Sequence, residues 1–266
     1  MKLQAYRLQN YRRLRDVVIE LDDEISIFVG ANNSGKTSAV QGLYSMLRGE
    51  AKKFELFDFS AALWAEIDAI GRTPPGDEDA PKQLPSILLD LWFRVGEDDL
   101  ATAMSLLPST EWDGKCVGIR VAFEPQDAHA LVRKFHELHE KANNAANALV
   151  ARRSVGAEAG AENAAAVVAD PGEYKPWPES LTKYLTKELS KEYTFRYYVL
   201  DERAFVGYQP KEVDYAPLPL GKEPGGAAIL KSLVRVDFLR AQRHLDDPDA
   251  GSSDRAESLS RRLSRF

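Results

Sequence analysis

Eight residues near the N-terminus, Gly30-Ala31-Asn32-Asn33-Ser34-Gly35-Lys36-Thr37, constrain the fold more than any other part of the chain. They satisfy the pattern Gly-x-x-x-x-Gly-Lys-Ser/Thr, which lies between a strand and a helix in phosphate-binding proteins. A mostly apolar run, residues 25–29, precedes the pattern, and apolar residues at helical spacing follow it over residues 38–48. The pattern predicts an α/β fold with a phosphate-binding loop between a central buried strand and a helix.

Each residue type in this loop has a chemical reason. Glycine at 30 and 35 permits backbone angles that a Cβ forbids, so successive N–H groups can point at phosphate oxygens. Lys36 supplies a positive charge for the β- and γ-phosphates, and the Thr37 hydroxyl is the natural Mg²⁺ ligand. We therefore expect ATP with Mg²⁺ as cofactors. The residues expected to contact the nucleotide are Gly30, Asn32, Asn33, Ser34, Gly35, Lys36, Thr37 and Ser38.

The rest of the chain divides into three expected regions. Residues 1–126 are predicted to form an N-terminal lobe, residues 127–192 a helical-hairpin insert, and residues 193–266 return strands followed by the start of a helical arm. Expected strands cover 2–8, 17–21, 25–29, 86–95, 117–123, 194–200 and 234–239; expected helices cover 38–48, 97–107, 127–153, 180–192 and 255–266. Residues 154–170 contain little beyond Ala, Gly, Glu and Val, which predicts a mobile tip.

Composition excludes some classes of protein. The net charge is −6, which argues against a stand-alone DNA clamp, although a local basic surface is compatible with it. No apolar run reaches the length of a membrane span, and the N-terminus lacks the apolar core of a signal peptide. The single cysteine, Cys116, fits a reducing compartment, so a cytoplasmic location is expected.

The N-terminal 48 residues also resemble a known family. Met1-Lys2-Leu3, Leu8-Gln9-Asn10-Tyr11-Arg12-Arg13-Leu14 and the loop from Gly30 to Ser38 look like the opening of the SMC/RecF-type ABC ATPases. Within that group, Gly-x-Asn-Asn-x-Gly-Lys-Thr-Ser and Val236-Asp237-Phe238-Leu239-Arg240-Ala241-Gln242-Arg243 most resemble the ATPase region of OLD family endonucleases and related anti-phage ATPases.

The resemblance implies further residues and partners. It places Arg12 where the family has a turn arginine that reaches the nucleotide, and Gln242 where the family has a glutamine that contacts Mg²⁺. It implies ATP hydrolysis in a dimer or higher oligomer, with each partner completing the other's site, and DNA as a partner of the full protein. A nuclease active site would lie outside these residues.

One later run has the pattern of the strand that ends in a catalytic acidic pair, namely Tyr197-Tyr198-Val199-Leu200-Asp201-Glu202. There, Asp201 would support Mg²⁺ and Glu202 would activate water. No signature helix precedes the run, which favours an ordinary turn instead. Three functions therefore stay open: an OLD-like lobe, an SMC/RecF-type DNA-repair ATPase, and a self-contained NTPase that uses Asp201 and Glu202.

Overall fold

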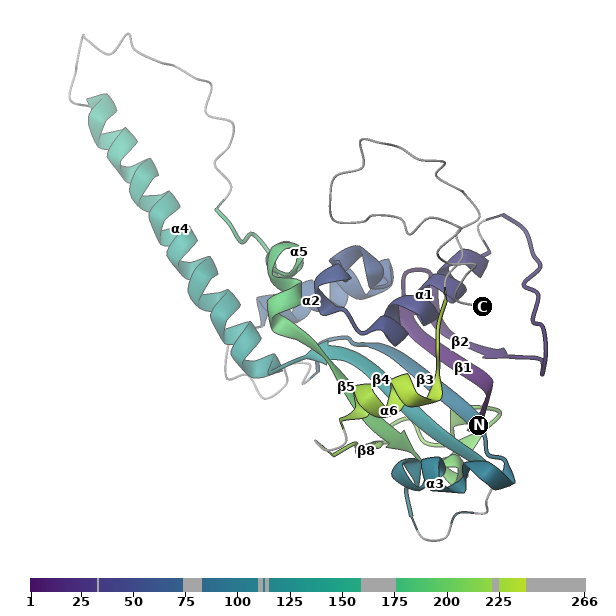
Figure 1. Cartoon of the computed structure of the whole chain (residues 1–266). Coiled ribbons are helices and arrows are strands. Elements are labelled where there is room, and N and C mark those ends of the chain that lie inside the picture. Colours follow the sequence, from purple (N-terminus) through teal and green to yellow (C-terminus); the bar gives the residue numbers. More distant parts are fainter. Residues whose placement is uncertain are drawn as a thin grey trace, which may run out of the picture. The chain divides into compact units, whose positions relative to one another are not determined.

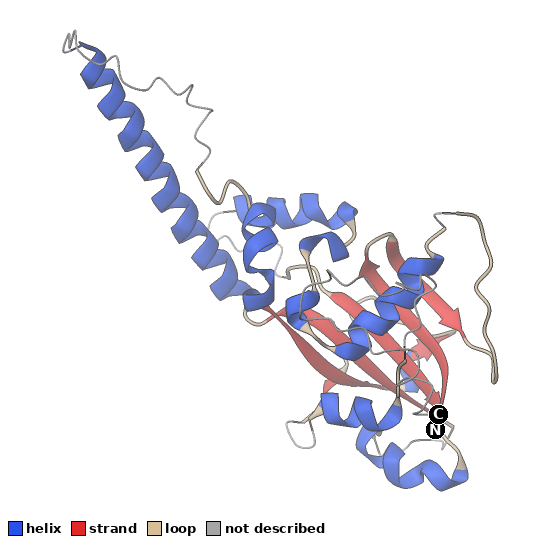
Figure 2. Ribbon diagram, turned by 45° about the horizontal axis from the view of Figure 1, so that its top comes forward, coloured by secondary structure: helices blue, strands red, loops and turns tan. Residues whose placement is uncertain are grey.

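A six-stranded antiparallel sheet forms the centre of the described structure (Figures 1 and 2). The computed structural model describes residues 1–32, 34–73, 83–109, 112, 115–158, 176–221 and 225–237, with the backbone alone for 149–158. Residues 1–235 form one unit, and only Val236 and Asp237 of the second unit are described. The three-part division expected from the sequence stays a prediction.

The strand order in this sheet is β2-β1-β3-β4-β5-β8, and all neighbouring pairs are antiparallel. The strands are β1 (Lys2–Tyr11), β2 (Leu14–Glu20), β3 (Ile87–Arg94), β4 (Cys116–Pro125), β5 (Tyr193–Leu200) and β8 (Leu218–Pro219). The expected strands 2–8, 17–21, 86–95, 117–123 and 194–200 are confirmed within one or two residues at most ends. Two more short strands, β6 (Phe205–Val206) and β7 (Gln209–Pro210), form a separate hairpin.

Helices cover one face of the sheet and build the main core. The α-helices are α1 (Lys36–Arg48), α2 (Trp64–Arg72), α3 (Leu100–Ala103), α4 (Ala128–Glu158), α5 (Leu181–Glu192) and α6 (Gly226–Leu233). Alternate strand residues such as Leu89, Leu91 and Ile119 point into this core and are fully buried. Because successive side chains point to opposite faces of a strand, every second residue faces the helices.

Helix α1 begins and ends at glycines in the left-handed region, Gly35 (φ 96°) and Gly49 (φ 63°). Gly42 lies in its middle, where a Cβ would stand 2.5 Å from Leu8 Cδ2 and 2.8 Å from Tyr11 Cδ1. Such distances leave no room for a side chain, so the helix packs on β1 more closely than any other residue type would permit.

The opposite face carries a row of charges across four strands. Arg7 donates from Nε and Nη2 to the two carboxylate oxygens of Asp16, at 2.7 and 2.6 Å. Arg120 likewise donates from Nε and Nη2 to the two carboxylate oxygens of Asp90, at 2.6 and 2.9 Å. Asp90 is fully buried and Arg120 nearly so, which a protein tolerates only because each charge has its partner. Their pairing helps to fix the register of β3 against β4.

The two helices of the expected insert are present. Helix α4 is 31 residues long and extends away from the sheet (Figure 1). Helix α5 starts at Ser180, whose side chain accepts from the Lys183 N–H. Residues 154–158 belong to α4, whereas the remainder of the expected mobile tip lies outside the described residues. Within the described residues, no helix combines the length and hydrophobicity needed to cross a bilayer.

The expectation for residues 25–29 is wrong. The segment is not a strand, and Ile25, Ile27 and Val29 are 74%, 80% and 88% exposed. A run that is apolar on both faces needs a neighbouring strand on each side and cover on both faces. The described residues supply neither, so the chain between β2 and α1 runs outside the sheet (Figure 1).

The remaining expected elements fare differently. Residues 97–106 are helical without a break, as expected, although only α3 (Leu100–Ala103) is α-helical and a 3₁₀ turn lies on each side of it; the Asp99 carboxylate accepts from the Gly96 N–H and caps the start. The described part of the expected strand 234–239, residues 234–237, is irregular and follows α6; neither α6 nor α2 was expected from the sequence. The expected helix 255–266 lies outside the described residues.

Candidate nucleotide-binding site

The loop before α1 closes around the amine of Lys36. Its Nζ donates to the carbonyl oxygens of Gly30 and Ala31, at 2.5 and 2.7 Å, and lies 3.3 Å from Ser34 Oγ. The Ser34 N–H also donates to the Ala31 carbonyl, at 3.3 Å. These bonds curl the loop so that the positive charge sits inside its bend.

The remaining residues of the loop fit a polyphosphate. A Cβ on Gly30 would lie 3.1 Å from Ser34 Oγ, so glycine keeps the bend open for an oxygen atom. Gly35 caps the N-terminus of α1, where unpaired N–H groups and the helix dipole attract anions. Thr37 is exposed in the first turn, where its hydroxyl would hold Mg²⁺ beside bound phosphates.

Not all of the expected contacts can be located. Asn32 is exposed at the start of the loop, and Ser38 is half-buried in the first turn of α1. Asn33 and Gln242 lie outside the described residues, so the roles expected for them stay predictions.

Arg12 lies in the tight turn between β1 and β2 with a left-handed backbone, φ 50°. Its guanidinium donates from Nε to Asp58 Oδ1 at 3.0 Å and from Nη1 to Gln41 Oε1 at 2.8 Å. Gln41 belongs to α1, five positions after Lys36. The turn arginine is therefore attached to the helix that carries the loop.

Gln41 and Asp58 were not among the residues expected at this site. A position five residues after Lys36 on an expected helix is a weak signal that could have drawn attention to Gln41. Asp58 is 46 residues from Arg12 in the chain, and nothing in its neighbourhood marks it, because the contact arises from the fold. Tyr11 lies next to this cluster, and burial, followed by the charge of Asp58, raises the pKa of its hydroxyl.

The acidic pair after β5 is engaged in a turn. Asp201 Oδ1 accepts from the N–H and Nε of Arg203, at 3.0 and 3.1 Å, and Oδ2 accepts from Nη2 at 2.9 Å. These bonds hold the pKa of Asp201 below its ordinary value. Glu202 lines a shallow hollow with Gln4 and Arg94. The turn that contains Asp201 and Glu202 therefore lies near the first residues of β1.

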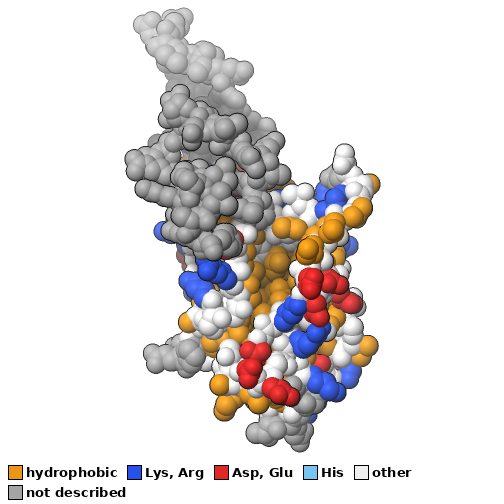
Figure 3. Space-filling view, turned by 45° about the vertical axis from the view of Figure 1, so that its right-hand side comes forward, with side chains coloured by type: hydrophobic (Ala, Val, Ile, Leu, Met, Phe, Trp, Pro, Cys, Tyr) orange, Lys and Arg blue, Asp and Glu red, His pale blue; other side chains and the backbone are white. Residues whose placement is uncertain are grey.

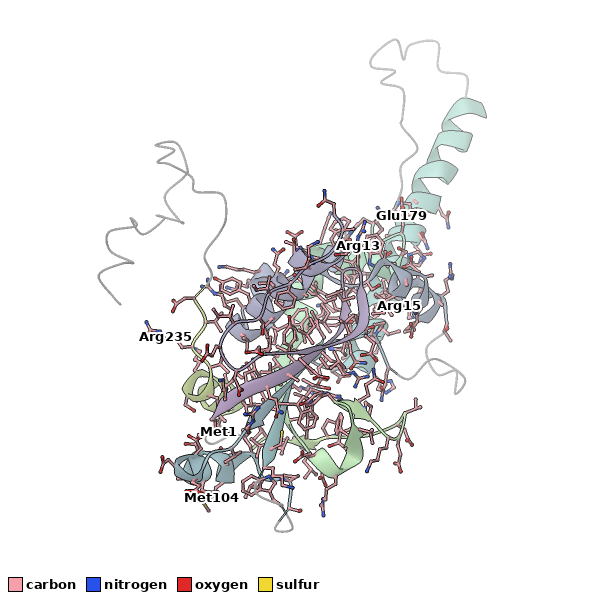
Figure 4. All side chains as sticks on the ribbon, turned by 90° about the vertical axis from the view of Figure 1, so that its right-hand side faces the viewer. Met1, Arg13, Arg15, Met104, Glu179 and Arg235 are labelled. Carbon is pink, nitrogen blue, oxygen red and sulfur yellow. The ribbon has the colours of Figure 1, made fainter. Side chains whose placement is uncertain are left out.

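That position is remote from the loop. Across the paired strands, Leu200 is level with Ala5 of β1, whereas Gly35 lies beside Leu14, which pairs with Tyr11. The distance along β1 from Ala5 to Tyr11 is roughly 20 Å at about 3.3 Å per residue. Figure 4 shows the same relationship, with Met1 and Arg13 at opposite ends of the sheet. A base must come within hydrogen-bond reach of its proton, so Glu202 cannot serve this chain's own loop in this arrangement.

The comparisons with known proteins show to which family the chain belongs. A family model described as "AAA ATPase domain" matches residues 1–171, which is more than half of the chain. The chain belongs to this family. The expected α/β fold of an ATPase domain, with an antiparallel N-terminal sheet, is therefore confirmed, although residues 25–29 do not form its expected central strand.

The ATPase domain also has distant curated relatives. It is 32% identical to the DNA replication and repair protein RecF of Staphylococcus carnosus (strain TM300) over 72 residues, which are 26% of this chain and 19% of that protein. It is 28% identical to RecF of Staphylococcus haemolyticus (strain JCSC1435) over 74 residues, or 26% and 20%. The match spans about a fifth of each relative's length.

Among solved structures, the ATPase domain is similar to a chain described under "Structural biochemistry of ATP-driven dimerization and DNA stimulated activation of SMC ATPases". The two are 18% identical, with a TM-score of 0.28, and the match covers 47% of this chain and 64% of that chain.

Proposed function

We propose that this ATPase domain binds ATP with Mg²⁺ at the loop 30–37 and hydrolyses it only when a second lobe and a partner domain complete the site. The position of the Lys36 amine, inside a bend that Gly30 keeps open before the N-terminus of α1, carries the proposal for binding. Lys36, the loop N–H groups and Thr37 would hold the phosphates and Mg²⁺. They supply electrostatic stabilisation and no general base.

The need for a second lobe rests on the exposed run 25–29. On the face shown in Figure 3, hydrophobic side chains gather beside a hollow. Ile25, Ile27 and Val29 are largely exposed, and Phe28 is 37% exposed. Burial of such a side chain contributes about 1.5–3 kcal/mol, so leaving several in water is costly. Strands from a second lobe that paired with this run would bury it and would fix the loop that follows.

Two biological roles fit this mechanism. The matches to RecF favour a DNA-repair ATPase of the SMC/RecF type, which would bind DNA and act as a homodimer or higher oligomer. The loop Gly30–Ser38 and the segment 236–243 favour an OLD-like lobe in anti-phage defence, with its nuclease centre elsewhere. Whether the reading frame continues past Phe266 separates these roles. A Toprim-like acidic cluster there would support the OLD-like role, and a long heptad arm would support the SMC/RecF-type role.

Titration of the purified chain with a fluorescent ATP analogue, with and without Mg²⁺, tests the binding proposal. We expect saturable binding that Mg²⁺ strengthens and that unlabelled ATP displaces, together with very slow phosphate release. A folded chain that shows no displaceable binding would contradict the assignment of the loop.

A further inference from the structure

The turn that carries Arg12 is held in an unfavourable backbone conformation by loop 58–60. A left-handed φ is uncommon for a residue with a side chain and persists only when its surroundings impose it. Here the Arg12 N–H donates to the Asp58 carbonyl at 2.7 Å, and the Ser60 N–H donates to the Asn10 carbonyl at 3.0 Å. The two backbone bonds fix where the Arg12 side chain leaves the turn.

Asp58 also holds the side chain itself. Its Oδ1 accepts from Arg12 Nε at 3.0 Å and lies 3.0 Å from Nη2. Its Oδ2 accepts from the Glu55 N–H at 3.1 Å, so both oxygens are engaged. The Asp58 side chain is only 13% exposed, whereas that of Arg12 is 38% exposed. A carboxylate fixed in this way restricts the guanidinium without removing it from solvent.

The remaining donors of Arg12 form an edge suited to an oxyanion. A guanidinium carries five N–H donors in a rigid plane. Within the described part of the chain, the Asp58 and Gln41 contacts engage one donor each on Nε, Nη2 and Nη1. One N–H on Nη1 and one on Nη2 remain, and a guanidinium N–H binds a phosphate oxygen strongly because both groups are charged.

This edge lies next to the first turns of α1. Tyr11 precedes Arg12 and packs against Gly42, while Leu14 follows two residues later and packs against Gly35. The bond to Gln41 ties the guanidinium to a position about 7.5 Å along the helix axis from Lys36, at about 1.5 Å per residue. The guanidinium is thereby held beside the second turn of α1, near the helix N-terminus at which a phosphate would bind.

We propose that Asp58 is a positioning residue, which holds the Arg12 guanidinium so that its remaining edge contacts a phosphate oxygen of the nucleotide, with Gln41 as a second support. The inference rests on the function proposed above for the loop 30–37. It adds that the affinity of this loop depends on an acidic residue that itself repels phosphate. Removal of Asp58 takes away a negative charge, so simple electrostatics predicts tighter nucleotide binding, whereas loss of positioning predicts weaker binding.

The test is a double-mutant cycle on nucleotide affinity with Arg12→Ala, Asp58→Ala and the double variant, measured by competition with unlabelled ATP. We expect Arg12→Ala to weaken binding about tenfold, and Asp58→Ala to weaken it several-fold. The double variant should be no weaker than Arg12→Ala alone, because Asp58 acts through Arg12. Arg12→Lys keeps the charge without the planar fork and should behave like Arg12→Ala.

Asp68→Asn is the matched control, since Asp68 accepts two hydrogen bonds from Thr182 of α5, away from the Arg12 turn. It should change thermal stability and leave the affinity unchanged. If Asp58→Ala does not fold, Asp58→Asn, which keeps one acceptor, replaces it in the cycle. Unchanged or tighter binding in the Asp58 variants, or additive losses in the double variant, would overturn the positioning role. If Lys36→Ala abolishes binding while Arg12→Ala has no effect, the loop assignment survives and this inference fails.

Discussion

The amine of Lys36 lies 2.7 Å from the carbonyl oxygen of Ala31, inside the bend of the loop that precedes α1. A lysine in this position can exchange carbonyl oxygens for phosphate oxygens with little movement. We therefore expect Lys36→Ala to weaken ATP binding about a hundredfold or more, since each bond to a charged group contributes about 1.5–3 kcal/mol. Fluorescent-ATP titration measures the effect. The exposed Lys52 provides a matched control, and Lys52→Ala should leave the affinity unchanged. Equal affinities in folded Lys36→Ala and wild type would exclude the site.

Glu202→Gln should leave ATP hydrolysis at its low background rate. Glu202 lies in the hollow beside Gln4, at the end of β1 away from the loop. Removal of a true general base costs about 10²–10⁴-fold in rate. Steady-state phosphate release from wild type, Lys36→Ala and Glu202→Gln under one set of conditions decides the question. A robust wild-type rate that collapses in Glu202→Gln, with ATP binding intact, would support the self-contained NTPase instead.

Asp201 should contribute to stability at neutral pH and lose that contribution in acid. Its bonds to Arg203 lower its folded-state pKa below the unfolded value. The contribution is therefore present above the unfolded pKa and disappears as the pH falls through the folded pKa. Urea unfolding of wild type and Asp201→Asn across this range should show a difference at pH 7 that shrinks toward pH 3. A difference independent of pH would mean that the ionised Asp201–Arg203 contact is not its source.

Ile27→Lys should change the free energy of unfolding of this chain by no more than about 0.5 kcal/mol, as expected of an exposed position. The side chain is 80% exposed, whereas Ile119 of β4 is fully buried. Ile119→Lys should destabilise the chain by more than about 4 kcal/mol, since it buries an unpaired charge. Chemical denaturation of both variants tests the contrast. A large loss in Ile27→Lys would show that residues 25–29 are part of a core within the chain itself.

Gly42→Ala should destabilise the chain by about 1–3 kcal/mol, the usual cost of forcing an extra methyl group into a packed core. The new Cβ would lie 2.5 Å from Leu8 Cδ2, so α1 must move away from β1. Gly221→Ala is the control, because no atom of the described residues lies within 4 Å of a Cβ at that position. Thermal unfolding of the two variants should separate them clearly, and ATP affinity should fall only in Gly42→Ala if the packing of α1 positions the loop.

The sequence by itself determined the local structure that short-range chemistry controls. Gly35 and Lys36 marked the loop and the start of α1, because glycine angles and the first turn of a helix are properties of a few neighbouring residues. Period-two alternation likewise indicated β1, and runs rich in apolar and aromatic residues indicated β3, β4 and β5.

Only the tertiary structure decided what depends on distant neighbours. The run 25–29 has the composition of a buried strand, yet it is exposed, because a strand exists only where other strands pair with it. The hydrogen bonds of Arg12 to Asp58 and Gln41 join segments 46 and 29 residues apart, and no local pattern records such contacts. The separation of Glu202 from the loop follows from the register of five strands, which fixes the acidic pair at one end of the sheet and the loop at the other.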